Sequence, residues 1–132
     1  MSHPEVAPAI VNLEQLGQIA ISVDDLARAK DFYQNSLGMK FLFEAGHLAF
    51  FRCGDIRLML TTPENAGPRG GTILYYKVAD IHATYEALRQ RGVAFIDEPH
   101  LIAKMPDHDL WMVFFKDTEG NTIGIMCEVR GL

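Results

Sequence analysis

Residues able to do acid–base or metal chemistry gather in one short segment, residues 98–111. It holds two histidines, His100 and His108, and the second lies between Asp107 and Asp109. A carboxylate beside an imidazole fixes its tautomer, so one interpretation is an acid–base pair or a displaced divalent-metal site. The other is a turn, because Pro-Asp-His-Asp favours turns and Asp side chains cap backbone amides there. We favour the turn, since the spacing of the two histidines matches no metal motif known to us.

A second group of candidates lies in segments that read as strands, where successive side chains point to opposite faces. Arg57 suits a carboxylate or phosphate on a ligand, although a pairing with Glu128 or Asp55 explains it equally well. The methionines suit planar or apolar ligands, because thioethers adapt to irregular shapes. The predicted ligand-binding residues are Gln18, Arg57, Met59, Tyr75, Trp111 and Met126.

The elements that position these residues form an internal repeat. Each copy has an alternating strand, an aspartate suited to N-capping (Asp25, Asp80), about three helical turns and a glycine stop. Short strands then follow, separated by turn residues. We expect these strands at 40–44, 47–52 and 56–61 in the first copy, and at 94–97, around 100–104, 110–116 and 122–128 in the second.

Alternation gives each sheet a helix-covered apolar face and a second face of mixed character. It does not decide which residue of Phe50/Phe51 or Phe114/Phe115 faces a cavity. The predicted class is α+β, with two βαβββ modules forming curved mixed sheets around a concave cavity. Residues 1–15 form an extension to a single domain at 16–129. That domain comprises module one (16–62), a Pro- and Gly-rich linker (62–71) and module two (72–129).

Several of these segments together resemble the vicinal-oxygen-chelate (VOC) superfamily, which includes glyoxalases, bleomycin-resistance proteins and dioxygenases. The resemblance extends over residues 16–129 and implies the fold above and a homodimer. It rests on the strand and capping segment 19–26, on Phe32-Tyr33, on Leu37-Gly38-Met39, and on Asp117-x-x-Gly120-Asn121, which closes the last hairpin with Gly120 left-handed.

The resemblance also implies where a metal would bind. Members with metal chemistry place one ligand near the start of each module's first strand and one in each module's last strand. Those positions are Gln18, Met59, Ile73 and Gly124 in this chain. Ile73 and Gly124 have no side-chain donor, Met59 offers a thioether and Gln18 one neutral amide. Four ligands for a divalent ion cannot be assembled from them. We therefore expect no metal at the usual site and no cofactor.

Composition excludes several function classes. The chain has 132 residues, a net charge of −5 and scattered Lys and Arg residues, which disfavours nucleic acid as a partner. No apolar run approaches the roughly 20 residues that span a bilayer, and the start lacks the features of a signal peptide. Cys53 and Cys127 lie in predicted strands and read as buried thiols. We expect a cytoplasmic protein.

Two functions remain in competition. The first is a small-molecule binder of the bleomycin-resistance type that works without a metal. The alternative is a lyase, isomerase, epimerase or dioxygenase-like enzyme that uses a relocated divalent metal or acid–base groups near His100, His108 and Tyr75. A pure interaction module would be a third class and would have a filled cavity. The sequence names no ligand and leaves catalysis open.

Overall fold

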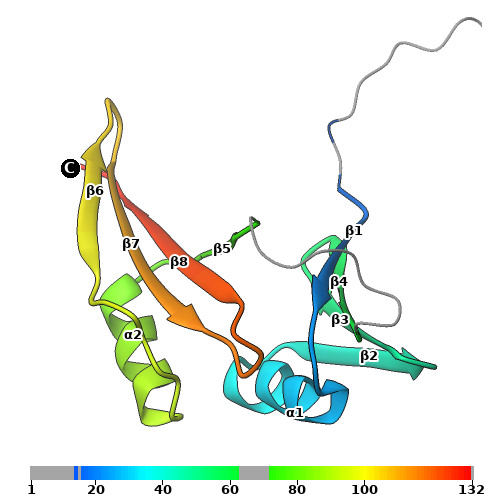
Figure 1. Cartoon of the computed structure of the whole chain (residues 1–132). Helices are drawn as coiled ribbons and strands as arrows, with labels where there is room; N and C mark the ends of the chain where they lie inside the picture. The colour runs from blue at the N-terminus through cyan, green and yellow to red at the C-terminus, as the bar shows by residue number, and fades with distance from the viewer. Residues whose placement is uncertain (1–13, 15, 63–71, 132) are drawn as a thin grey trace, which may run out of the picture.

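The computed structural model describes residue 14, residues 16–62 and residues 72–131. Most of the predicted N-terminal extension and of the linker lies outside these residues. The described chain folds as two modules, each with a helix and a four-stranded sheet (Figure 1). None of its helices is both long and apolar enough to cross a membrane.

The elements follow the predicted repeat. Module one contains β1 (Gln18–Ser22), α1 (Leu26–Asp31), the π-helical segment η1 (Phe32–Ser36), β2 (Lys40–Ala45), β3 (Leu48–Cys53) and β4 (Ile56–Thr61). Module two contains β5 (Leu74–Lys77), α2 (Ile81–Gln90), β6 (His100–Lys104), β7 (Asp109–Lys116) and β8 (Thr122–Val129). The strand orders are β1-β4-β3-β2 and β5-β8-β7-β6, with the first strand of each module parallel to its last. This confirms the predicted α+β class of two βαβββ modules.

Local chemistry sets the helix ends as predicted. The Asp25 carboxylate accepts a hydrogen bond from the Arg28 amide at 3.0 Å, and the Asp80 carboxylate accepts one from the Ala83 amide at 3.0 Å. The chain then leaves the helices through glycines with positive φ, at Gly38 and at Gly92.

The strand predicted at residues 94–97 is wrong. Among the described residues, the backbone of this segment pairs with the backbone of β7 only through an isolated bridge between Phe95 and Phe115 and a hydrogen bond from the Ile96 amide to the Phe114 carbonyl at 2.8 Å. The ladder stops because a side chain replaces the backbone acceptor: the Asp97 carboxylate accepts the Phe114 amide at 2.8 Å. The ring of Phe95 instead packs against Tyr85 and Phe115, with centroids 4.6 and 5.3 Å away.

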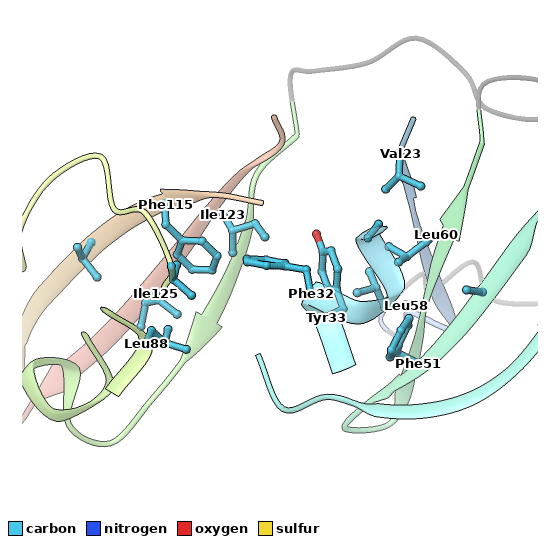
Figure 2. Packing of buried hydrophobic residues seen from close by; sticks show 14 of the residues in the cluster. Val23, Phe32, Tyr33, Phe51, Leu58, Leu60, Leu88, Phe115, Ile123 and Ile125 are labelled. Atoms are coloured by element: carbon cyan, nitrogen blue, oxygen red, sulfur yellow. The ribbon is translucent and has the colours of Figure 1, made fainter. Parts of the chain in front are cut away.

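The helix-covered faces of both sheets form one continuous core. Phe51 and Phe115 are fully buried in it, which places their neighbours Phe50 and Phe114 on the opposite faces. Phe32 lies between the modules and points towards Ile123 and Phe115 (Figure 2), with its ring centroid 6.4 Å from that of Phe115. The structure thereby decides which phenylalanine of each pair, Phe50/Phe51 and Phe114/Phe115, faces the core.

The turn between β7 and β8 joins module two to the start of α1 (Figure 1). The buried Glu119 carboxylate accepts the amides of Asp24 and Asp25, each at 2.9 Å, and pairs with Arg28 at 2.8 Å. Burial alone would raise the pKa of Glu119, but these hydrogen bonds and one from Thr118 lower it to about 2. The carboxylate therefore stays ionised at neutral pH.

Asp117 strengthens the same joint. Its carboxylate accepts the buried Tyr33 hydroxyl at 2.8 Å and the Asn121 side-chain amide at 2.9 Å. Asn121 also donates to the carbonyl of Ser22 at 3.0 Å. Burial is the main cause of a strongly raised pKa for Tyr33, with Asp117 adding to it, so this phenol keeps its proton. The closing Asp-x-x-Gly-Asn segment thus connects the modules as well as turning the chain.

Candidate functional site

The face of sheet one that α1 leaves uncovered, called open face one, holds three of the predicted binding residues. Leu58 and Leu60 point into the core, so Arg57 and Met59 point the other way, and Gln18 pairs with Arg57 in register. The Gln18 side-chain amide donates to the Met59 sulfur at 3.6 Å. The strand register therefore brings Gln18, Arg57 and Met59 together as predicted.

The corresponding open face two, on sheet two, is shaped by an aromatic side chain. Tyr75 pairs with Gly124 across β5 and β8, and Phe114 pairs with Gly124 from β7. A Cβ added to Gly124 would lie 2.6 Å from Cδ1 of Tyr75. The Tyr75 ring makes an edge contact with Phe114, with centroids 5.8 Å apart. Met126 shares this face, since it pairs with Lys77.

The residues at the four usual metal positions do not fit a divalent ion. The Gln18 amide is bound to a thioether, which is a poor partner for hard or borderline cations. Ile73 supplies no donor, and the space beside Gly124 holds the ring of Tyr75. A carboxylate at position 124 would require that ring to move. A divalent metal at these four positions therefore has no part in the function proposed below.

The structure separates the two histidines. His100 lies on β6 opposite Met112, on open face two, whereas His108 lies in the turn between β6 and β7. The four steps along β6 from His100 to Lys104 alone span about 13 Å at roughly 3.3 Å per residue. The structure therefore does not bring the two histidines together. No group of three or more His, Cys, Asp or Glu side chains suited to a metal occurs among residues 14, 16–62 and 72–131.

His108 belongs to a surface charge network. Its Nδ1 lies 2.7 Å from Asp107, which pairs with Arg130 at 2.7 Å, and Arg130 in turn contacts Glu128 at 3.1 Å. Hydrogen bonds from Arg130 and then His108 lower the pKa of Asp107 to about 2. Glu128 pairs with Lys77 and Arg130, and among the described residues no ion pair joins Arg57 to Glu128 or to Asp55. The segment at 105–108 is the turn that the sequence favoured.

Trp111 does not share a face with the other predicted binding residues. It alternates in phase with Val113 and Phe115 and packs on the helix side, 5.5 Å from the ring of His82. There it lines a cavity of about 420 Å³ beside the start of α2. The sequence could not predict which face Trp111 occupies, because residues 110–115 are apolar at every position and do not alternate.

Two more cavities are lined by described residues. One, of about 380 Å³, lies beside Asp107, His108 and Arg130. The other, of about 160 Å³, is apolar and lies between Leu37 and Met39 of module one and α2. None of the three is lined by Gln18, Met59 or Tyr75. The concave space expected between the open faces therefore stays a prediction.

A comparison with protein families finds a match over most of the chain. A model of the Glyoxalase/Bleomycin resistance protein/Dioxygenase superfamily matches residues 15–125. The chain belongs to this superfamily. The predicted resemblance is confirmed, and the departures at the metal positions are departures of this member.

Two individual relatives match this chain along most of their own length. An uncharacterized protein of Bacillus subtilis, YraH, is 27% identical over 129 residues, covering 84% of this chain and 96% of its own. A glyoxylase-like domain-containing protein of Didymella fabae is 31% identical over 121 residues, covering 84% of this chain and 91% of its own.

Solved structures of the superfamily share the fold. Lactoylglutathione lyase from Agrobacterium tumefaciens superposes with a TM-score of 0.72 at 21% identity, covering 88% of this chain and 95% of that one. A superfamily member from Sphaerobacter thermophilus gives 0.73 at 23% identity, covering 88% and 98%. At these identities the likeness establishes the fold and nothing about substrates.

Sequence reasoning missed residues that only the register reveals. Lys40 pairs with Arg52, and Arg52 pairs with Arg57, so two further cations share open face one. Phe43 stacks on Phe50 with centroids 4.5 Å apart. No periodicity within one strand predicts these neighbours, because they depend on hairpin lengths and on the bulge between residues 41 and 43.

Proposed function

We propose that this protein binds a small organic ligand on its open sheet faces and does so without a metal ion at the superfamily's usual positions. The main support is the pair Tyr75 and Gly124. An aromatic ring takes the space that a metal-binding side chain on β8 would need. A ring at that point offers an apolar stacking surface in place of a Lewis acid.

Side-chain chemistry on both faces supports an organic ligand. Met59 and Met126 are half-buried and adaptable, and Tyr75 is 45% exposed. Arg57 and Gln18 add polar groups at one end of sheet one. A few polar groups beside apolar and aromatic side chains are typical of small-molecule sites.

The proposal extends to properties expected from the sequence. We propose a small-molecule ligand, a symmetric homodimer and a cytoplasmic location, with neither nucleic acid nor membrane as partner. The alternative enzyme would now have to use His100 or His108 singly, since the register keeps them apart.

Elemental analysis tests the metal part of the proposal. Protein purified without chelator is expected to contain far less than one Fe, Ni, Mn or Zn atom per chain. Stoichiometric metal that is lost in Gln18→Ala or Met59→Ala would contradict the proposal. Stoichiometric metal lost in His100→Ala or His108→Ala would favour the alternative enzyme.

Ligand capture tests the binding part. The full chain is incubated with a cell metabolite extract, separated from free metabolites, and the retained compounds are identified by mass spectrometry. We expect a retained compound that Tyr75→Ala loses and that His82→Ala keeps. His82 is the matched aromatic control, because its ring lies on the helix side against Trp111. Equal retention by both variants would contradict the proposal.

A further inference from the structure

Three cations lie next to one another across sheet one. Lys40 of β2 pairs with Arg52 of β3, Arg52 pairs with Arg57 of β4, and Gln18 of β1 completes the row. Directly paired residues share a face of the sheet, and neighbouring strands are about 4.8 Å apart. Lys40, Arg52 and Arg57 therefore form a compact group on open face one, which we call the basic row.

The described residues do not compensate the charge of the basic row. Within residues 14, 16–62 and 72–131, none of the three cations forms an ion pair, whereas Lys30 pairs with Glu44 at 3.0 Å and Lys77 with Glu128 at 3.3 Å. Like charges placed directly opposite each other destabilise a sheet. The chain has a net charge of −5, so acidic residues are plentiful, yet no acidic residue in the described part of the chain pairs with this row. The arrangement therefore favours an anion from outside the chain.

An apolar row lies beside the basic row. Phe43, Phe50 and Met59 are partners in the adjoining same-face positions of β2, β3 and β4. Phe43 is 44% exposed and stacks on Phe50 with centroids 4.5 Å apart. The Arg57 guanidinium lies 5.6 Å from the Phe50 ring and so links the two rows.

The spacing of the rows limits what fits. Same-face positions along a strand are about 7 Å apart. This separation suits a flat ring bonded to an oxyanion, with the ring on the apolar row and the anion on the basic row. Guanidinium groups bind carboxylate and phosphate oxygens through paired hydrogen bonds.

We propose that open face one binds a planar aromatic ligand through a carboxylate or phosphate group held by the basic row. Phe43 and Met59 contact the ring, the buried Phe50 supports Phe43 from below, and Arg52 and Arg57 contact the oxyanion. This inference rests on the proposed function and names the class of its ligand.

Matched probes test the anion requirement on the full-length chain. 2-Naphthoate carries the ring and a carboxylate, 2-naphthalenemethanol carries the ring alone, and inorganic phosphate carries an oxyanion alone. Their affinities are measured by amide NMR titration, which also locates the binding face. We expect naphthoate to bind at least about tenfold more tightly than either other probe, with shifts centred on Phe50, Arg52, Arg57 and Met59.

Charge-matched variants separate the basic row from general electrostatics. Arg52→Gln and Arg57→Gln are each expected to weaken naphthoate binding at least about fivefold and to leave naphthalenemethanol binding unchanged. Arg89→Gln removes the same charge from exposed α2, where Arg89 pairs with Glu86, and is expected to change neither affinity. 2-Naphthyl phosphate, titrated in parallel, distinguishes a preference for carboxylate from one for phosphate.

Three results would overturn the inference. Equal binding of naphthoate and naphthalenemethanol on open face one would remove the anion requirement and leave the proposed function standing. Phosphate binding as tightly as naphthoate would remove the role of the apolar row. If none of the probes shifts the amide signals of open face one, the inference is overturned outright. The proposed function would then be judged by the metabolite capture alone.

Discussion

The ring of Tyr75 lies where a side chain at position 124 would begin. The residue at 124 is glycine, so the ring of Tyr75 can lie close over β8 and make its edge contact with Phe114. A single residue type therefore decides two properties of this face. It removes a metal-ligand position and creates an aromatic surface.

This arrangement predicts the effect of filling position 124. Gly124→Ala would place a Cβ 2.6 Å from Tyr75 Cδ1, so the ring must turn away and lose its contact with Phe114. We expect the free energy of unfolding to fall by about 1–2 kcal/mol, measured by urea denaturation. In a Tyr75→Ala background the same substitution is expected to leave the free energy of unfolding almost unchanged.

A second glycine provides the control. A Cβ at Gly17 would meet no atom within 4 Å, so Gly17→Ala is expected to leave stability nearly unchanged. If Gly124→Ala proved as harmless as Gly17→Ala in the wild-type background, the placement of Tyr75 over Gly124 would be wrong.

Strands β3 and β4 show what alternation can and cannot predict. On β4, alternation correctly placed Leu58 and Leu60 beneath the helix, because Met59 separates them and polar residues flank them. It could not orient Phe50 and Phe51, since two adjacent phenylalanines fit either phase. Register is harder still, because it depends on turns and bulges, and for that reason Lys40 and Arg52 were missed.

Shortening a phenylalanine side chain to alanine is expected to lower the free energy of unfolding by different amounts on the two faces of sheet one. Phe51 is fully buried, so Phe51→Ala is expected to lower the free energy of unfolding by about 3–5 kcal/mol. Phe43 lies on open face one, and Phe43→Ala is expected to cost about 1 kcal/mol through its lost stacking on Phe50. Chemical denaturation of both variants checks this, and similar losses would contradict the assigned phase.

The connecting turn makes a prediction about pH. The folded pKa of Glu119 is about 2, below its ordinary value of 4.5. Its stabilising contribution is therefore complete above pH 4.5 and is lost as the pH falls towards 2. Glu119→Gln is expected to lower the free energy of unfolding at pH 7 by about 2 kcal/mol and to flatten this acid dependence.

An exposed ion pair is the matched control for Glu119. Glu86 pairs with Arg89 at 3.1 Å on the surface of α2, and both side chains are more than half exposed. Glu86→Gln is expected to change stability by less than about 1 kcal/mol and to keep the wild-type acid dependence. Equal effects of the two substitutions would show that Glu119 does not hold the modules together.

At the scale of the whole molecule, the helix-covered sides of the two modules share one core and the open faces remain outside it. Apolar side chains also remain exposed, including Leu101 and Ile102 on the edge strand β6. Such residues are typical of surfaces that a partner covers. They agree with the proposed homodimer.

Light scattering after size exclusion tests the dimer. The chain has a mass of 14.8 kDa, so two copies are expected to give about 30 kDa. The double substitution Leu101→Asp and Ile102→Asp, which introduces two negative charges, is expected to shift the mass towards that of one chain if β6 contributes to the interface. A mass near that of a single chain for the wild type would contradict the dimer.

The most direct test of the metal-free ligand site is a titration of the chelator-treated, ¹⁵N-labelled chain with Mn²⁺. A bound Mn²⁺ ion broadens the amide signals around it, so its position is read from the residues that disappear. We predict no saturable broadening centred on Gln18, Met59, Ile73 and Gly124. Broadening that centres on those four amides and saturates at one ion per chain would contradict the account.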